Sequence, residues 1–131
     1  MQLADIYAQF ARCKFWEERY RLLIQLSRRL PVPSADELAQ WQQIHGCESR
    51  LWFEFSLTPR QIHAYSDARL MQGLLVIILA ALTEQTAAQL QQFDLHALFD
   101  ELQITRHLTA TRLNGLAQIQ AKVRAAAALS R

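Results

Sequence analysis

The sequence predicts a single domain of the α+β class, spanning residues 1–131, in which helices precede and follow one β-hairpin. Two patterns lead to this prediction. Apolar residues recur at helical spacing through both ends of the chain, and they alternate with polar residues between positions 50 and 66. A chain of 131 residues also has the right length for one hydrophobic core, and neither an internal repeat nor a long linker divides it.

Two amphipathic helices are predicted at the N-terminus, the first over residues 3–10 and the second from about residue 15. The prolines of the PVPS motif end the second helix, because proline lacks an amide donor and disfavours helix in the residue before it. Ser34 and Glu37 have the spacing of a capping box, which predicts a short helix through Trp41. The side chains of the second helix expected to be buried are Trp16, Tyr20, Leu23, Ile24 and Leu30.

The period of the pattern then changes to that of β-strands. The stretch RLWFEFSL, from Arg50, is dense in aromatic and aliphatic side chains, and its second half alternates in polarity, as does RQIHAYS, from Arg60. Thr58-Pro59 is the expected turn between them, so we predict a hairpin. A two-stranded ribbon is marginally stable alone, so it must pack on helices or gain a third strand.

The second half of the chain is predicted to be helical. Ser66 or Asp67 is expected to cap a long helix, which is apolar on nearly every side and should lie centrally, under the sheet. Thr86, Asp94 and Thr109 are placed to cap three further helices. The buried stripe of the last helix is expected to consist of Leu113, Leu116, Ile119 and Val123. The alanine-rich end of the chain is expected to fray.

Composition excludes several classes of function. The formal net charge is only +2, and no stretch concentrates Lys and Arg, so we expect no nucleic-acid partner. The N-terminus has no secretory signal pattern, and the most hydrophobic stretch, residues 74–82, is too short to cross a bilayer. Two cysteines are too few for a disulfide scaffold or a four-ligand metal site. We therefore expect a cytoplasmic protein with reduced thiols, no bound metal and no membrane partner.

The stretch IHGCESRLW, residues 44–52, places Cys47 where a loop meets a strand. Gly46 permits backbone angles that other residues avoid and gives the loop freedom to move. Two interpretations stay open: a buried cysteine that fills space, or a thiol presented to a partner. His45 is near enough for a Cys–His pair of the kind used in nucleophilic catalysis, although no signature of an oxyanion pocket or an orienting residue accompanies it.

Cys13 and Arg112 are further candidates for a functional site. Cys13 lies in a helical pattern beside Arg12 and Lys14, whose charges would lower its pKa, but without a loop around it a structural role is favoured. Arg112 stands near the start of the last helix, where a cation opposes the helix dipole. Residues placed against local preference sometimes serve a site, and the alternative is an ordinary exposed arginine.

Four stretches carry a resemblance to a known family: FARCKFWEERYRLLIQLSRRLP, IHGCESRLW, SDARLMQGLLVIIL and LTATRLNGL. In order and approximate spacing the chain resembles the SufE family of sulfur acceptors, which includes the close relative CsdE. The resemblance runs from Phe10 to the final helix and is most specific in GCESRLW. It implies an α+β fold with helices packed on a small antiparallel sheet, similar to that of the IscU scaffold.

The resemblance also implies an activity. In this family a loop cysteine accepts sulfane sulfur from the persulfide of a PLP-dependent cysteine desulfurase, of the SufS or CsdA type. The transfer stimulates the desulfurase, and the sulfur passes on towards iron–sulfur cluster assembly on the SufBCD complex. The protein itself would then need no cofactor, because PLP belongs to the desulfurase, and it would be a sulfur-transfer partner rather than a stand-alone catalyst. The alternative is an adaptor that regulates a desulfurase without carrying sulfur.

By motif, the resemblance makes Cys47 the acceptor. It matches Arg112 to an arginine that packs near the cysteine loop, and Asp67 to the acidic residue that opens the long apolar helix. Gly46 is expected to let the loop move, and Arg50 or Arg112 to favour the thiolate when the loop is exposed. The chain departs from the family pattern in its short hairpin and in having no glycine before the Ser-Asp pair that follows it.

Overall fold

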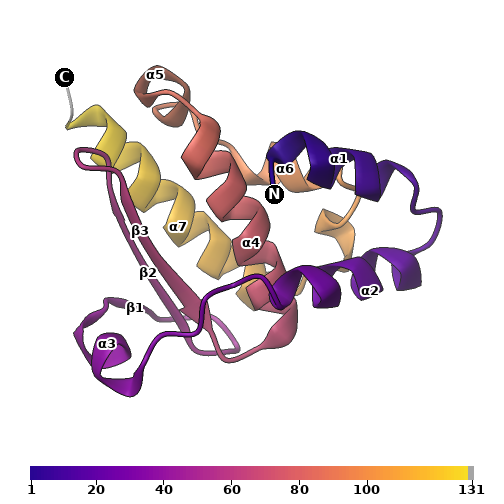
Figure 1. Ribbon diagram of the computed structural model, residues 1–131, viewed down its shortest axis with the longest axis horizontal. Helices are drawn as coiled ribbons and strands as arrows, with labels where there is room; N and C mark the ends of the chain where they lie inside the picture. Colours follow the sequence, from indigo (N-terminus) through magenta and orange to yellow (C-terminus); the bar gives the residue numbers. More distant parts are fainter. Residues whose placement is uncertain (130–131) are drawn as a thin grey trace.

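Helices flank a small antiparallel sheet in a computed structural model that describes residues 1–129 (Figure 1). The α-helices are α1 (Leu3–Ala11), α2 (Trp16–Ser27), α3 (Ala35–Gln40), α4 (Arg69–Glu84), α5 (Ala87–Leu90), α6 (Leu95–Glu101) and α7 (Ala110–Ala128). The strands are β1 (Gln43–Ile44), β2 (Leu51–Ser56) and β3 (Gln61–Ser66), and a 3-10 helix, η1 (Thr105–His107), precedes α7. The predicted α+β class, with helices packed on a small antiparallel sheet in one domain, is confirmed.

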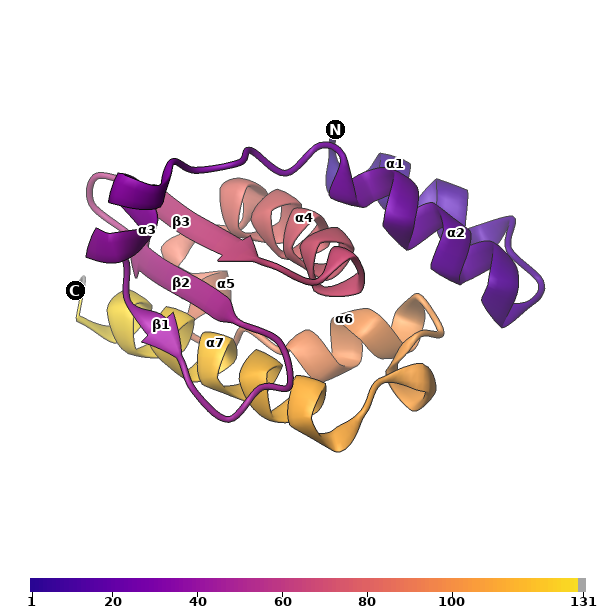
Figure 2. The same ribbon diagram turned by 90° about the horizontal axis from the view of Figure 1, so that it is seen from below.

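The sheet has the order β1-β2-β3, and the hairpin of β2 and β3 follows the predicted boundaries closely. Leu51 pairs with Ser66 across the hairpin, and Gln43 of β1 pairs with Trp52. The hairpin is therefore supported in both of the ways expected, since it gains a third strand and also packs on helices. Both α4, against β3, and α7, against β2, cover one face of the sheet (Figure 2).

The long helix α4 runs through the middle of the molecule, between α2 and the sheet (Figures 1 and 2). No charged residue occurs between Arg69 and Glu84, so the helix can be buried on all sides. Gly73 allows α2 to cross closely, because a Cβ there would lie 2.3 Å from the carbonyl oxygen of Leu23. The fully buried side chains of α4 are Met71, Leu74, Leu75, Ile77, Ile78, Ala81 and Leu82. The prediction of a central helix under the sheet is confirmed.

The buried face of α2 differs from the predicted one. Leu23 and Leu30 are buried as expected, but Tyr20 is 45% exposed, so its predicted burial is wrong. The buried stripe runs through positions 19, 23 and 26, and it therefore includes Arg19, which is only 7% exposed. The Arg19 guanidinium donates to the carbonyl of Cys13 and to the side chain of Gln103, which compensates for its burial.

The helix caps show which local signals hold. Thr86, Asp94 and Thr109 each accept a hydrogen bond from an amide of the first turn, as predicted. The expected cap of α4 is wrong, because its N-cap is Ala68 and the Asp67 carboxylate bonds Arg50 instead.

The C-terminal end of α7 also departs from the prediction. The helix continues to Ala128, so the expected fraying is wrong up to that residue, whereas Ser130 and Arg131 lie outside the described residues. The side chain of Ala127 is fully buried, and its carbonyl accepts a hydrogen bond from Gln91 (3.4 Å). Contact with α5 therefore holds the alanine-rich segment in place.

The turn of the hairpin is fixed to the end of α4 by Arg60. Its Nη1 donates to the carbonyl oxygens of Leu82 (2.9 Å) and Gln85 (2.5 Å), which lack partners within the helix. We expect Arg60→Ala to lower the free energy of unfolding by about 1 kcal/mol, measured by urea denaturation. The control is Arg28→Ala, because the exposed side chain of Arg28 makes no hydrogen bond or ion pair within residues 1–129. Equal losses of unfolding free energy in the two variants would contradict a stabilising role of the Arg60 hydrogen bonds.

Candidate functional site

The cysteine loop, residues 45–50, joins β1 to β2 and runs beside the N-terminal half of α7 (Figure 2). Gly46 has a φ of +89°, in the left-handed region where glycine is favoured. A Cβ at Gly46 would also lie 2.7 Å from the side-chain nitrogen of Asn114. Both observations explain why glycine precedes the cysteine. Cys47 itself is half-buried and packs against the core.

The side chain of Cys47 rests on Gly115 of α7. A Cβ added to Gly115 would lie 3.2 Å from both the Cβ and the Sγ of Cys47, and 3.2 Å from a methyl carbon of Leu51. These distances are shorter than ordinary van der Waals contacts between carbon atoms. Because glycine has no side chain, Gly115 leaves the space that the Cys47 side chain occupies.

Two amide side chains of α7 hold the backbone of the loop. Asn114 donates to the carbonyl of Gly46 (3.2 Å), and Gln118, one turn further along, donates to the carbonyl of His45 (2.6 Å). Within the described part of the chain, residues 45–49 make no backbone–backbone hydrogen bond. The loop is thus fastened to α7 by side chains and not by a strand ladder.

A carboxylate of the loop binds the start of α7. Glu48 accepts a hydrogen bond from the hydroxyl of Thr109 (2.9 Å) and forms an ion pair with Arg112 (3.1 Å). Arg112 is 20% exposed, and its buried Nε lacks a partner among the described residues. The unfavourable position of a cation near a helix N-terminus is therefore offset by the negative charge of Glu48.

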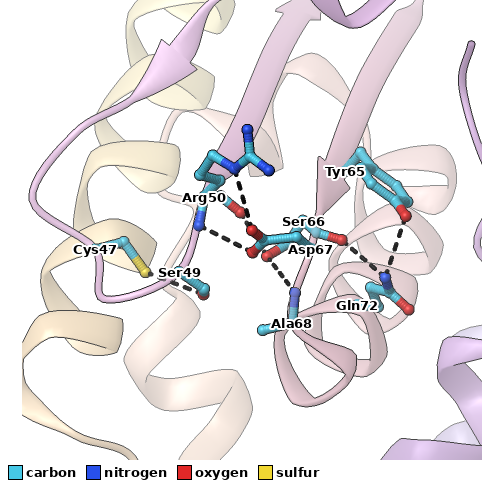
Figure 3. Close-up of polar contacts among 8 residues, drawn as sticks. All are labelled: Cys47, Ser49, Arg50, Tyr65, Ser66, Asp67, Ala68 and Gln72. Atoms are coloured by element: carbon cyan, nitrogen blue, oxygen red, sulfur yellow. Dashed lines mark hydrogen bonds and ion pairs between the residues drawn. The ribbon is translucent and has the colours of Figure 1, made fainter. Parts of the chain in front are cut away.

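The other end of the loop is fixed by Arg50 and Asp67 (Figure 3). The backbone amide and the Nε of Arg50 donate to the two carboxylate oxygens of Asp67, at 3.0 and 3.2 Å. The guanidinium carbon of Arg50 also lies 5.7 Å from the ring centroid of Trp52. Both charged side chains are substantially exposed, at 69% and 44%, so their contribution to stability is small. The main effect of the pair is to join the start of β2 to the segment that leads into α4.

The structure brings some of the predicted site residues together and separates others. Gly46, Cys47 and Arg112 meet at the N-terminal half of α7. Arg50 and Asp67 form their own pair, and the Arg50 side chain extends away from the Cys47 sulfur (Figure 3). Sequence reasoning did not identify the residues of α7 that contact the loop, namely Asn114, Gly115 and Gln118. The i, i+3 spacing of Arg112 and Gly115 was the available signal, since it places both on one helix face.

The remaining candidates are placed elsewhere. The ring of His45 makes no hydrogen bond to Cys47. Within residues 1–129, the Sγ of Cys47 has one hydrogen-bond contact, which is with the hydroxyl of Ser49 (3.9 Å). Cys13 bonds the carbonyl of Gln9 through its sulfur (3.6 Å). Burial raises the pKa of Cys13, Glu18 raises it further, and Arg19 opposes them, so the predicted lowering of this pKa is wrong.

In residues 1–129 no group of three or more His, Cys, Asp or Glu side chains is arranged to hold a metal ion. No helix in this part of the chain combines the length and the apolar character needed to span a membrane.

Comparisons with known proteins give one consistent result. The family model described as "SufE: Fe-S metabolism associated domain" matches residues 4–127. A SufE-like protein of Haemophilus influenzae is 45% identical over 116 residues, which cover 85% of this chain and 90% of that protein. The sulfur acceptor protein CsdE of Escherichia coli is 39% identical over 110 residues, which cover 82% of this chain and 75% of CsdE. The chain belongs to the SufE family.

Proposed function

We propose that this protein is a sulfur acceptor that takes sulfane sulfur from a PLP-dependent cysteine desulfurase onto Cys47. Membership of the SufE family supports the proposal, as does the name of the CsdE relative, a sulfur acceptor. The observation that carries it is the position of Cys47 on a loop, half-buried, beside no set of metal ligands within the described residues. An isolated thiol in such a place is suited to thiol–persulfide exchange.

The transfer step is a displacement at sulfur. The Cys47 thiolate attacks the terminal sulfur of the desulfurase persulfide, and a new sulfur–sulfur bond forms on Cys47. The sulfur–sulfur bond of the desulfurase breaks, and its electron pair stays on the desulfurase cysteine, which leaves as a thiolate. One sulfur atom changes protein and no external oxidant or reductant is needed.

The loop suits both the protection and the delivery of this sulfur. At rest, Cys47 is half-buried on Gly115, which limits its reaction with small oxidants and thiols. Because residues 45–49 are held by side chains, the loop can lift on docking without breaking a backbone–backbone hydrogen bond. The protein is then a partner of a SufS-like or CsdA-like desulfurase in the cytoplasm. It stimulates that enzyme and passes sulfur towards cluster assembly on a SufBCD-type scaffold, and it has no cofactor of its own.

The test is sulfur retention after contact with a desulfurase. The chain is incubated with a cysteine desulfurase and cysteine, separated from the enzyme, and assayed for bound sulfane sulfur by cyanolysis. The proposal predicts faster alanine release by the desulfurase and sulfane sulfur bound to the separated chain. Faster alanine release without bound sulfur would instead support an adaptor that regulates the desulfurase without carrying sulfur.

Arg112 provides a second test of the site. We expect Arg112→Ala to slow sulfur acceptance severalfold while lowering the free energy of unfolding by only about 1 kcal/mol, because its partly exposed ion pair with Glu48 contributes little to folding. The measurements are the rate of sulfur uptake and urea denaturation.

The matched control for Arg112 is Arg124→Ala. Arg124 lies on the same helix and donates to the carbonyl of Phe93 (2.7 Å), far along α7 from the cysteine loop. The control should keep full sulfur uptake. If Arg112→Ala lowered uptake only in proportion to lost folded protein, Arg112 would have a structural role alone.

A further inference from the structure

The Cys47 sulfur is flanked by two different surfaces. On one side lies Gly115, where even a single added carbon would be 3.2 Å from the Sγ, so no further atom fits between the sulfur and α7. On another side is the hydroxyl of Ser49, 3.9 Å from the Sγ (Figure 3). A second sulfur bonded to Cys47 therefore cannot point into α7, whereas on another side the Sγ faces the Ser49 hydroxyl.

The charged side chains near the loop are already paired. Arg112 binds Glu48, and Arg50 binds Asp67 with its side chain directed away from the sulfur (Figure 3). In contrast, the Ser49 hydroxyl makes no hydrogen bond within residues 1–129 other than its contact with Cys47. Its hydroxyl is thus a side-chain donor in contact with the sulfur that no other acceptor occupies, although the sequence suggested that an arginine would favour the charged form.

Bond lengths agree with this arrangement. A sulfur–sulfur bond is about 2.05 Å long, so a terminal sulfur attached obliquely on the Ser49 side lies closer to the hydroxyl than the Sγ does, whereas one directed straight at the hydroxyl would collide with it. The terminal sulfur of a deprotonated persulfide carries negative charge. A hydroxyl that donates to a charged acceptor forms a shorter and stronger hydrogen bond than one that donates to a neutral acceptor.

We propose that Ser49 is a positioning residue that donates a hydrogen bond to the terminal sulfur of the Cys47 persulfide. This inference rests on the proposed sulfur-acceptor function. The bond holds the transferred sulfur along the loop, on the side away from α7, and shields it from solvent thiols. Gly115 and Ser49 together then determine the direction in which the sulfur is presented.

The test uses a persulfide installed chemically, so it does not depend on a desulfurase. In a Cys13→Ser background, Cys47 is treated with inorganic polysulfide: its thiolate takes one sulfur atom and a polysulfide shorter by one sulfur leaves. The half-life of the persulfide in dithiothreitol is then measured by mass spectrometry for the parent and for Ser49→Ala, Ser49→Thr and Ser56→Ala. Ser56 is a half-buried serine at the far end of β2, without a side-chain hydrogen bond in the described chain.

We expect Ser49→Ala to shorten the half-life about tenfold, the effect of losing one hydrogen bond to a charged group. Ser49→Thr, which keeps the hydroxyl, should restore most of it, and Ser56→Ala should match the parent. The midpoints of thermal unfolding should agree among all variants. If Ser49 had only a structural role, its replacement would lower this midpoint. A half-life for Ser49→Ala within about twofold of the parent, or equal shortening by alanine and threonine, would overturn the inference. Failure of the proposed function would appear separately, as a chain that receives no sulfur from the desulfurase while the Ser49 effect remains.

Discussion

Replacement of Cys47 by serine is expected to abolish sulfur acceptance, whereas Cys13→Ser should leave it nearly intact. A serine hydroxyl is not ionised at neutral pH and cannot form the sulfur–sulfur bond that the transfer needs. The substitution is close in size, and the half-buried site on Gly115 accommodates an oxygen in place of sulfur, so the fold should be retained. Bound sulfane sulfur and alanine release by the desulfurase are the two measurements.

Cys13→Ser is a demanding control because both cysteines have intermediate exposure and a sulfur hydrogen bond. The two thiols differ in location, since Cys13 lies in the connection between α1 and α2, with its sulfur bonded to a carbonyl of α1, and Cys47 lies on the loop over α7. Undiminished sulfur acceptance in the Cys47 variant would refute the assignment of the acceptor. Loss of acceptance in the Cys13 variant at full stability would show that the second thiol takes part.

Substitution of Gly115 by alanine is expected to drive the cysteine loop away from α7. The new Cβ would stand 3.2 Å from the Cβ and Sγ of Cys47, so one neighbour must move. Leu51, the other neighbour, is fully buried in β2, whereas Cys47 lies on a loop held by side chains. We therefore expect the loop to yield and the alkylation of Cys47 by iodoacetamide to become several times faster.

The same substitution has opposing effects on stability. Overpacking costs about 1–3 kcal/mol, while alanine is favoured over glycine within a helix by about 1 kcal/mol. The net loss in free energy of unfolding should be about 1 kcal/mol, small enough to leave a folded protein. Alkylation of Cys13 in the same molecule is the internal control and should keep its rate. An unchanged alkylation rate for Cys47 would mean that Gly115 does not determine where the thiol rests.

Much of the fold could be predicted from the sequence because the helices and the hairpin have strong periodic patterns and side-chain caps. The errors arise where tertiary contacts override a local preference. Asp67 is a good helix cap by residue type, but it binds Arg50 instead. Arg19 occupies the buried face of α2 because the carbonyl of Cys13 and the distant side chain of Gln103 accept from its guanidinium, and Tyr20 is exposed as a result. Strand β1 was not predicted because two residues are too few for alternation to appear.

The candidate site could be predicted only in part. Gly46 and Cys47 were identifiable because the motif itself is unusual, and Arg112 because it opposes the helix dipole. The contacts of the loop with α7 join residues far apart in sequence, such as Gly46 and Asn114, and nothing local indicates that they meet. Gly115 in particular appears as an unremarkable helix glycine until the fold places Cys47 against it.

The central claim is that Cys47 carries sulfur, and intact-mass and peptide mass spectrometry test it most directly. The chain is incubated with a cysteine desulfurase and cysteine, separated without reductant, and digested after alkylation. We predict the added mass of one sulfur atom on the peptide that contains Cys47, and none on the peptide that contains Cys13. Stimulation of the desulfurase with no added sulfur on Cys47 would contradict the account and leave the protein a regulator rather than a carrier.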